Sequence, residues 1–554
     1  MNSPKPPAVA GQALSVKQRG ASINHFVKTN IYIHMNRNIN ITAALGLTCL
    51  VSSSLNGQSS DDKRPNIIYI MSDDHAFQAI SAYGGLLKDL APTPNIDRIA
   101  RDGMRFDRCL VTNSISGPCR AVVLTGKYSH LNGFLSNEAK QFDGSQQTFP
   151  KLLQKAGYNT AIIGKWHLGS QPTGFTHWEI LPGQGNYYNP DFITGDGTHR
   201  ENGYVTEIIT EKCIEWLNDV KDSGKPFMLM MHHKAPHREW QPGPHELTLY
   251  NDVTFPEPES LFDDYSNRGT AEKTQDMTIA KTMRIEEDIK LYSDRSKMRN
   301  TGLNRLTPEQ LAAWDSVYNP MIREFYGADL TGDSLTSYKY QRYMQDYLAC
   351  IAAVDKSVGE VLDYLKANGL SDNTVVIYTS DQGFYLGEHG WFDKRFMFEE
   401  SYRTPLLIRW PGVVASGTVN NDMVSNLDLA ETFLDIAGTD VPDDMQGRSM
   451  VPILKGKTPS NWRKEHYYHY YEYPGWHMVK RHYGISTERY KLIHFYYDID
   501  EWELFDLQSD PQELKNVYDD PQYSSVRKKL HKHLVRLMQK LSDSDELAKQ
   551  FLPN

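Results

Sequence analysis

The sequence predicts an α/β fold with a large, mostly parallel mixed sheet sandwiched by helices, followed by a smaller α+β subdomain on a short antiparallel sheet. Three observations support this prediction. Apolar runs of strand length alternate with helical segments, which favours a mainly parallel sheet. These runs are apolar throughout, as expected for strands buried on both faces. After about residue 450 the pattern changes to short, aromatic-rich strands.

The elements of the large sheet follow one another in a regular order. The predicted strands are residues 66–71, 160–163, 227–231 and 374–379. The predicted helices are residues 93–103, 148–156, 206–220 and 347–367. Thr93-Pro94 is typical of a helix start, whereas Gly103 and Gly157 are typical of helix ends. This alternation assigns residues 64–450 to one catalytic domain.

Two regions depart from the alternation. Residues 238–340 are polar and rich in Pro, Asp and Ser, with a helical piece at 308–314, and we interpret them as an insertion lying over the site. Residues 451–554 form the predicted C-terminal subdomain. Its elements are an aromatic-rich stretch at 466–473, short strands at 484–495 and 502–507, and an amphipathic helix at 524–541.

Charge and hydrophobicity exclude some classes of partner. The chain of 554 residues has a formal net charge of −10, which argues against nucleic acid as a partner. No segment is apolar over the length that a transmembrane helix requires. Residues 35–58 combine a basic start, an apolar core and small residues, so they are interpreted as a signal peptide beginning at Met35. Residues 1–34 would then be an over-extended or non-native N-terminus, and the protein would be periplasmic or secreted; the alternative is a disordered tail without export.

Polar side chains follow each of the four predicted strands. Asp73 and Asp74 follow the first, Lys165 and His167 the second, His237 the third, and Asp381 and Gln382 the fourth. Open α/β sheets bind ligands at this edge. Three acids brought together there would repel one another unless a cation lies between them. All-oxygen ligands suit a hard ion, with Ca²⁺ preferred over Mg²⁺.

The segment from Asn113 to Lys127 is the candidate nucleophile site. Pro118 suits the first turn of a helix and Gly126 its αL end, which predicts a loop carrying Ser116 followed by a two-turn helix. The amides of a helix start attract anions. With Arg120 in the first turn and Lys127 just past the last, this is a plausible site for attack on an oxyanion ester. The alternative is an ordinary serine at a helix start.

The run Ser116-Gly117-Pro118-Cys119-Arg120, extended by Leu124-Thr125-Gly126, resembles the signature of the formylglycine-dependent sulfatases. The resemblance implies an alkaline-phosphatase-like fold and hydrolysis of a sulfate ester. It also implies that Ser116 is oxidised to the aldehyde 3-oxoalanine (formylglycine) by a maturing enzyme able to use serine. Cys119 is the weaker candidate nucleophile, because Val123 would then stand where the signature has arginine.

The resemblance also assigns roles to other residues. It implies that Ca²⁺ is held by Asp73, Asp74, Asp381, Gln382 and the modified Ser116, with Gln382 a departure from the usual last ligand. The implied catalytic residues are Ser116, Arg120, Lys127, Lys165, His167, His237 and Lys394. Among these, His237 is our candidate general acid, because a sugar alkoxide needs protonation as it leaves. His232 and His233 are interpreted as mainly structural.

The substrate is expected to be a sulfated saccharide. The loop 181–188 with Gln184, and the segment 476–482 with Trp476 and His477, resemble N-acetylglucosamine-6-sulfatases of Bacteroidetes, which implies action on the 6-O-sulfate in glycosaminoglycan or mucin degradation. The expected substrate-binding residues are Lys165, His237, Lys394, Gln184, Trp476 and His477. Three alternatives stay open: core positions for these aromatics, a phosphoester or phosphonate monoester hydrolase of the same superfamily, and a non-catalytic sulfated-glycan-binding protein.

Overall fold

The central sheet has eleven strands within residues 64–138 and 141–550, the part of the chain that the computed structural model describes. Their order is β12-β2-β11-β8-β1-β7-β3-β4-β5-β6, and β13 pairs with β2. The strands are β1 Asn66–Ser72, β2 Met104–Leu110, β3 Asn159–Lys165, β4 His177–Leu181, β5 Asp191–Thr194, β6 Gly197–Arg200, β7 Phe227–His232, β8 Thr374–Ser380, β11 Arg403–Arg409, β12 Thr418–Asn420 and β13 Val424–Ser425.

The four strands predicted from apolar runs are the four central neighbours, β8, β1, β7 and β3, and they are parallel to one another. Strand β11 lies antiparallel between β8 and β2, so the sheet is mixed. The predicted fold class is therefore confirmed. Strands β2 and β11 were not predicted: β2 carries three charged residues, Arg105, Asp107 and Arg108, which interrupt its apolar run, and β11 contains Pro405.

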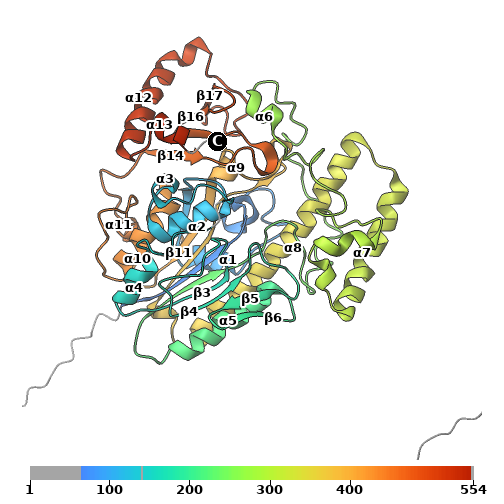
Figure 1. Cartoon of the computed structure of the whole chain (residues 1–554), viewed down its shortest axis with the longest axis horizontal. Helices are drawn as coiled ribbons and strands as arrows, with labels where there is room; N and C mark the ends of the chain where they lie inside the picture. The colour runs from blue at the N-terminus through green and yellow to red at the C-terminus, as the bar shows by residue number, and fades with distance from the viewer. Residues whose placement is uncertain (1–63, 139–140, 551–554) are drawn as a thin grey trace, which may run out of the picture. The chain divides into compact units, whose positions relative to one another are not determined.

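Alternate residues of β1 pack into separate cores on the two faces of the sheet. Ile68 and Ile70 pack against α1 (Ile96–Arg101), α5 (Val205–Val220) and α8 (Gly332–Ala367). Ile67, Tyr69 and Met71 face α2 (Ser116–Thr125), α4 (Phe149–Lys155) and α10 (Leu429–Ile436). This two-residue alternation is the pleat of a strand that is buried on both faces. In Figure 1, α8 lies on one side of the sheet and α10 on the other.

The predicted insertion contains α6 (Thr270–Thr274) and α7 (Pro308–Ala328). Thr307 and Gln310 form a capping box at the start of helix α7. The helix is longer than the predicted piece 308–314, because it continues past Pro320. Helix α8 likewise begins at Gly332 rather than near residue 347.

A second sheet of four antiparallel strands follows in the C-terminal part of the chain. It consists of β14 (Glu465–Tyr470), β15 (His482–Thr487), β16 (Tyr490–Phe495) and β17 (Glu501–Asp506), paired in that order. Helix α12 (Ser524–Lys540) packs on this sheet through Leu530 and Leu534. The smaller subdomain is thus confirmed as antiparallel, while its boundary at residue 450 stays a prediction.

The second sheet shares a hydrophobic core with the first part of the chain. Tyr468 and Phe505 of this sheet lie in one buried cluster with Leu110, Trp391 and Phe398. The predictions for residues 1–34 and 35–58 lie outside the described residues. Among the helices that the structure describes, none has the length and apolar character needed to cross a bilayer.

Candidate active site

The predicted site residues meet at one edge of the sheet because the strands that carry them are neighbours. Asp73 and Asp74 follow β1, and Asp381 and Gln382 follow β8 directly beside it. On the other side of β1, His237 follows β7 and Lys165 ends β3. The register therefore brings four strand ends together.

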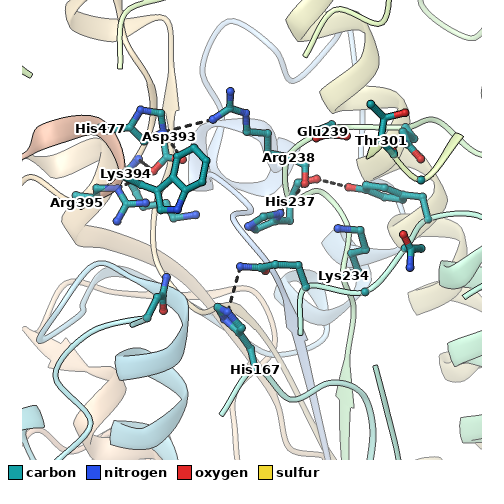
Figure 2. A pocket seen from close by; sticks show the side chains of 18 of the residues that line it. His167, Lys234, His237, Arg238, Glu239, Thr301, Asp393, Lys394, Arg395 and His477 are labelled. Atoms are coloured by element: carbon teal, nitrogen blue, oxygen red, sulfur yellow. Dashed lines mark hydrogen bonds and ion pairs between the residues drawn. The ribbon is translucent and has the colours of Figure 1, made fainter. Parts of the chain in front are cut away.

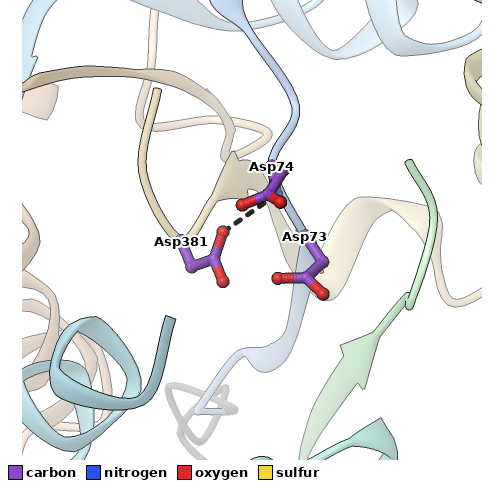
Figure 3. A group of neighbouring side chains, drawn as sticks. All are labelled: Asp73, Asp74 and Asp381. Atoms are coloured by element: carbon purple, nitrogen blue, oxygen red, sulfur yellow. Dashed lines mark hydrogen bonds between the residues drawn. The ribbon is translucent and has the colours of Figure 1, made fainter. Parts of the chain in front are cut away.

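Asp73, Asp74 and Asp381 form a buried cluster of carboxylates (Figure 3). One oxygen of each lies within 4.8 Å of an oxygen of the other two. Burial and the neighbouring carboxylates raise the pKa of Asp74 to about 7, against the opposing effect of the Lys394 ammonium. Burial and Asp73 also raise the pKa of Asp381. Burial, and then the proximity of the other carboxylates, disfavours the charged forms of Asp74 and Asp381, and a cation between these groups would relieve both effects.

The chemistry of the donor set fits a hard metal ion. The Nε2 atom of Gln382 donates to Asp74, whereas its Oε1 atom is buried and has no hydrogen-bond partner among the described residues. A cation held by Asp73, Asp74, Asp381 and this oxygen would satisfy it, because carboxylate and amide oxygens are ligands of Ca²⁺ and Mg²⁺. The unsatisfied amide oxygen beside three carboxylates supports a divalent metal ion at this place.

Ser116 is the first residue of α2, which runs for ten residues rather than the predicted two turns. Its side chain is buried, and its Oγ atom donates to Oδ1 of Asp73 at 3.1 Å. Arg120, one turn later, places Nη2 3.1 Å from Oδ2 of Asp381. Cys119 belongs instead to the apolar cluster shared with the second sheet, where burial raises the pKa of its thiol. The helix therefore turns Ser116, and not Cys119, toward the carboxylates.

Lys127 is not brought to the site, contrary to the predicted catalytic role. It lies beyond the C-terminal end of α2, about 15 Å along the helix axis from Ser116 at 1.5 Å per residue. Its ammonium pairs with Asp444. Arg120 lies on the same face of α2 as Ser116, because it follows one helical turn later. Lys127 lies beyond the opposite, C-terminal end of the helix.

A cavity of about 450 Å³ opens above this edge (Figure 2). His167, Gln184, His237, Lys394, Trp476 and His477 line it, as predicted for the site. Arg284, Thr301 and Gly302 of the insertion form another part of the wall, and Glu472 comes from the C-terminal subdomain. The cavity is thus completed by chain segments that lie far apart in the sequence.

His237 is held in one orientation by its surroundings. Its Nδ1 atom donates to the backbone carbonyl oxygen of Arg238 at 2.6 Å, so Nε2 is left for the reaction. Nε2 lies 3.8 Å from Oδ2 of Asp74. Burial and the Lys165 ammonium hold the pKa of His237 well below its ordinary value. The neutral form of the imidazole is therefore favoured, and a nearby anion would favour the charged form that can donate a proton.

Gln184 links the two residues that follow β3. Its Oε1 atom accepts from Lys165 Nζ, and its Nε2 atom lies 3.1 Å from Nε2 of His167. Burial lowers the pKa of Lys165 to about 8, partly offset by its ion pair with Asp73. Lys165 can therefore exchange a proton near neutral pH.

Trp476 and His477 occupy different depths of the cavity wall. Trp476 is 67% exposed at the rim, so it is not a core residue of the second sheet. His477 is buried, with Nε2 3.2 Å from Oδ2 of Asp393, and Nδ1 donates to the carbonyl oxygen of Asp276. The predicted structural histidines lie deeper still: His232 contacts the carbonyl oxygen of Lys165, and His233 contacts Ser357.

Several cavity residues were missed by the sequence analysis. They are Lys234, Arg238, Glu239, Asp393 and Arg395. Each directly neighbours or closely flanks a predicted site residue, His237 or Lys394, and that proximity was the available signal. It is weak, because charged residues in loops are mostly solvated.

Comparison with known proteins decides the family. The family model "Sulfatase" matches residues 65–439, and the model "N-sulphoglucosamine sulphohydrolase, C-terminal" matches residues 387–540. The chain belongs to the sulfatase family. As a sulfatase it is similar to the N-acetylglucosamine-6-O-sulfatase of Bacteroides thetaiotaomicron, at 51% identity over 92% of each chain.

Two further comparisons extend this sulfatase relationship. The solved structure of BT4656 in complex with its substrate D-glucosamine-2-N,6-O-disulfate has a TM-score of 0.85 and 52% identity, covering 87% of this chain and 99% of that one. The N-acetylglucosamine-6-sulfatase of Homo sapiens is 27% identical over 74% of this chain and 68% of the relative. The suspected resemblance is thereby confirmed.

Proposed function

We propose that this sulfatase removes the 6-O-sulfate from N-acetylglucosamine and related glucosamine units of host glycans. The observation that carries the proposal is the 51% identity, over 92% of both chains, to a relative named for that activity. The structural neighbour that binds a 6-O-sulfated glucosamine supports it. A cavity of about 450 Å³ is also of the size that encloses a small ligand.

The floor of the cavity supplies the groups that a sulfate ester requires. The ammonium groups of Lys165 and Lys394 would bind sulfate oxygens. At 4 Å and an effective dielectric of 20, each would contribute about 4 kcal/mol of Coulomb attraction before desolvation is subtracted. Arg120 keeps Asp73 and Asp381 in place beside Ser116. These residues would hold the sulfur close to the Ser116 position.

Two groups that the chain itself does not encode complete the proposal. An aldehyde made from Ser116 would supply, as its hydrate, one hydroxyl for attack on sulfur and a second for release of sulfate. A divalent ion, Ca²⁺ in preference to Mg²⁺, would be held by Asp73, Asp74, Asp381 and Gln382 beside the Ser116 oxygen, and would lower the pKa of the attacking hydroxyl.

His237 would act as the general acid for the leaving sugar oxygen. Since Nδ1 donates to the Arg238 carbonyl, Nε2 is the atom that would carry the transferred proton. A sulfate anion beside the ring favours the charged imidazolium and so raises a pKa that burial has lowered. His167 and Lys165, linked through Gln184, would assist the later proton transfers.

A panel of defined monosulfated sugars tests the proposal. We expect N-acetylglucosamine-6-sulfate to be hydrolysed at least tenfold faster than its 3-sulfate or galactose-6-sulfate. Assays of phosphate and phosphonate monoesters, with Ca²⁺ and with Mn²⁺, test the alternative that the protein is a phosphoester or phosphonate monoester hydrolase. The proposal would be contradicted if either phosphorus ester were hydrolysed faster than N-acetylglucosamine-6-sulfate. It would also be contradicted if none of the sulfated sugars were hydrolysed.

The proposal includes export and maturation. A serine-competent maturing enzyme would oxidise Ser116, and the segment 35–58 would direct the protein to the periplasm or the medium. A chain that binds sulfated sugar but keeps an unmodified serine in its own host would instead be a glycan-binding protein.

A further inference from the structure

Four cationic side chains surround the carboxylate cluster, and three of them are neutralised by it. Lys165 pairs with Asp73. Lys394 Nζ lies 2.7 Å from Oδ2 of Asp74. Arg120 is bound to Asp381 at 3.1 Å and to Asp73 at 3.4 Å.

Lys234 is the fourth of these cations, and it has no such partner. Among the side chains that the structure describes, which excludes those of residues 139, 140, 299 and 300, no carboxylate lies within 4.0 Å of its Nζ atom and no acceptor is hydrogen-bonded to it. The residue is only 4% exposed, and its ammonium lies 4.7 Å from the centre of the Tyr187 ring. A cation–π contact of this kind compensates only part of the cost of removing an ammonium from water.

The uncompensated charge lies next to the proposed reaction centre. Lys234 precedes His237 by three residues and lines the cavity together with it (Figure 2). Gln184 lines the same cavity. Its charge acts on both Lys165 and His237, and the strongest carboxylate acting on it in return is Asp73, ahead of Glu239. Lys234 therefore faces the space between the general acid and the sulfate-binding lysine.

We infer that Lys234 is a further catalytic residue whose ammonium binds an oxygen of the sulfate group during its transfer. This inference rests on the proposed function. A buried, unpaired charge destabilises a folded chain, and it is retained where an anion arrives to neutralise it. The transferring sulfate is that anion, because Lys234 faces the groups that surround it rather than the exposed rim at Trp476.

The inference predicts that stability and function change in opposite directions. The variant Lys234→Met keeps the length of the side chain and removes the charge, so its Tm without ligand should be equal to or above that of the wild type. Lys290→Met is the matched control. Lys290 is equally buried, but its ammonium pairs with Asp346 at 2.9 Å and donates to the Asp288 carbonyl at 2.7 Å. Its replacement should lower Tm.

Inorganic sulfate is the binding probe, since it does not depend on the sugar. The Tm of the wild type should rise with sulfate concentration, because a ligand bound only by the folded state stabilises it. This rise should be largely lost in Lys234→Met and retained in Lys290→Met. If the Tm of the wild type did not rise with sulfate concentration, the proposed function itself would be contradicted. A wild type and a Lys234→Met protein that respond equally would overturn the role of Lys234 alone.

Kinetics separate a sulfate contact from a sugar contact. Lys234→Met should lower kcat/KM about 10²-fold, and by a similar factor for N-acetylglucosamine-6-sulfate and for 4-nitrophenyl sulfate, since both present the same sulfate group. A loss confined to the sugar substrate would overturn the inference. A fall in Tm together with unchanged kcat/KM would do the same, because it would show a structural lysine.

Discussion

The guanidinium of Arg238 and the carboxylate of Asp288 form a two-point ion pair, with Nε–Oδ1 at 2.6 Å and Nη2–Oδ2 at 2.8 Å. Asp288 lies in the middle of the insertion, whereas Arg238 is its first residue, directly follows His237 and accepts the hydrogen bond from its Nδ1 atom through its backbone carbonyl. The pair therefore ties the insertion to the residue that orients the proposed general acid.

Removal of Asp288 should destabilise the fold. Asp288→Ala would leave the Arg238 charge buried without its partner, which typically costs about 3–5 kcal/mol. The comparison is Glu286→Ala in the same segment, where the ion pair with Lys297 is far more exposed and should contribute little to stability. Urea unfolding of both variants measures the difference. Equal effects would show that the Arg238–Asp288 pair adds no stability.

Loss of His237 should depend on the leaving group. A sugar alkoxide needs a proton as it departs, whereas 4-nitrophenolate does not. His237→Ala should therefore reduce kcat/KM for the sugar sulfate about 10²–10⁴-fold and affect 4-nitrophenyl sulfate far less. Steady-state assays on both substrates measure this. Equal losses would reassign His237 to positioning of the sulfate.

Removal of divalent metal should lower both activity and stability. Without the ion, Asp73, Asp74 and Asp381 repel one another and the buried Gln382 Oε1 atom stays unsatisfied. Excess chelator should decrease Tm and abolish turnover, and Ca²⁺ should restore both. Scanning calorimetry with chelator, and then with Ca²⁺ or Mg²⁺, identifies the preferred ion. An unaltered Tm and unaltered activity in chelator would rule out the metal site.

Maturation of Ser116 should appear as a mass change of about −2 Da in the peptide that spans it. Protein from a host without a serine-competent maturing enzyme should fold and bind sulfate but turn over very slowly, since serine alone is a weak nucleophile. Ser116→Cys made beside a cysteine-specific maturing enzyme should regain activity, while Cys119→Ser should be tolerated. Full activity with an intact serine in the mass spectrum would refute the mechanism.

The stabilising contribution of the buried Glu431 carboxyl should fall as the pH rises from about 5 to 8. Burial raises the pKa of Glu431 from 4.5 to about 8, so its carboxyl is protonated in the folded state. A raised folded-state pKa adds stability that is complete below the unfolded pKa and is lost as the pH passes the folded one. Burial raises the pKa of Glu388 and Glu400 to about 7, which adds to the same trend. The Tm of Glu431→Gln, measured relative to the wild type, should therefore rise between pH 5 and pH 8, whereas Glu360→Gln, on the surface of α8, should show no such trend.

The sequence predicted those parts of the fold that depend on local patterns. The central strands were recognisable because residues such as 66–71 are apolar on both faces, and their parallel pairing placed the polar strand ends together. Strand β11 was not recognisable, since Arg403, Thr404 and Pro405 at its start oppose a strand assignment. Its place between β8 and β2 is set by tertiary pairing.

The same limit applies to the site. Ser116, Asp73 and Lys394 were predicted because they lie in motifs. Lys234 and Arg238 were not, because their surroundings depend on distant chain segments: Lys234 lies over Tyr187, and Arg238 pairs with Asp288. Lys127 shows the opposite error: a residue within a motif was assigned to the site, although the length of α2 holds it away.

Under the proposed maturation of Ser116, the shared core of the two sheets and the burial of this residue would set an order of events during synthesis. Ser116 is 1% exposed in the finished fold, so an enzyme that oxidises it must reach the chain earlier. His477 and the strands that close the core around α2 emerge from the ribosome about 360 residues later, which takes roughly 20–70 s at about 5–20 residues per second. That interval is the time in which the nascent segment stays open to modification. Faster translation or a shortened C-terminal part would change how much of the protein matures, without any change in the residues that carry out the reaction.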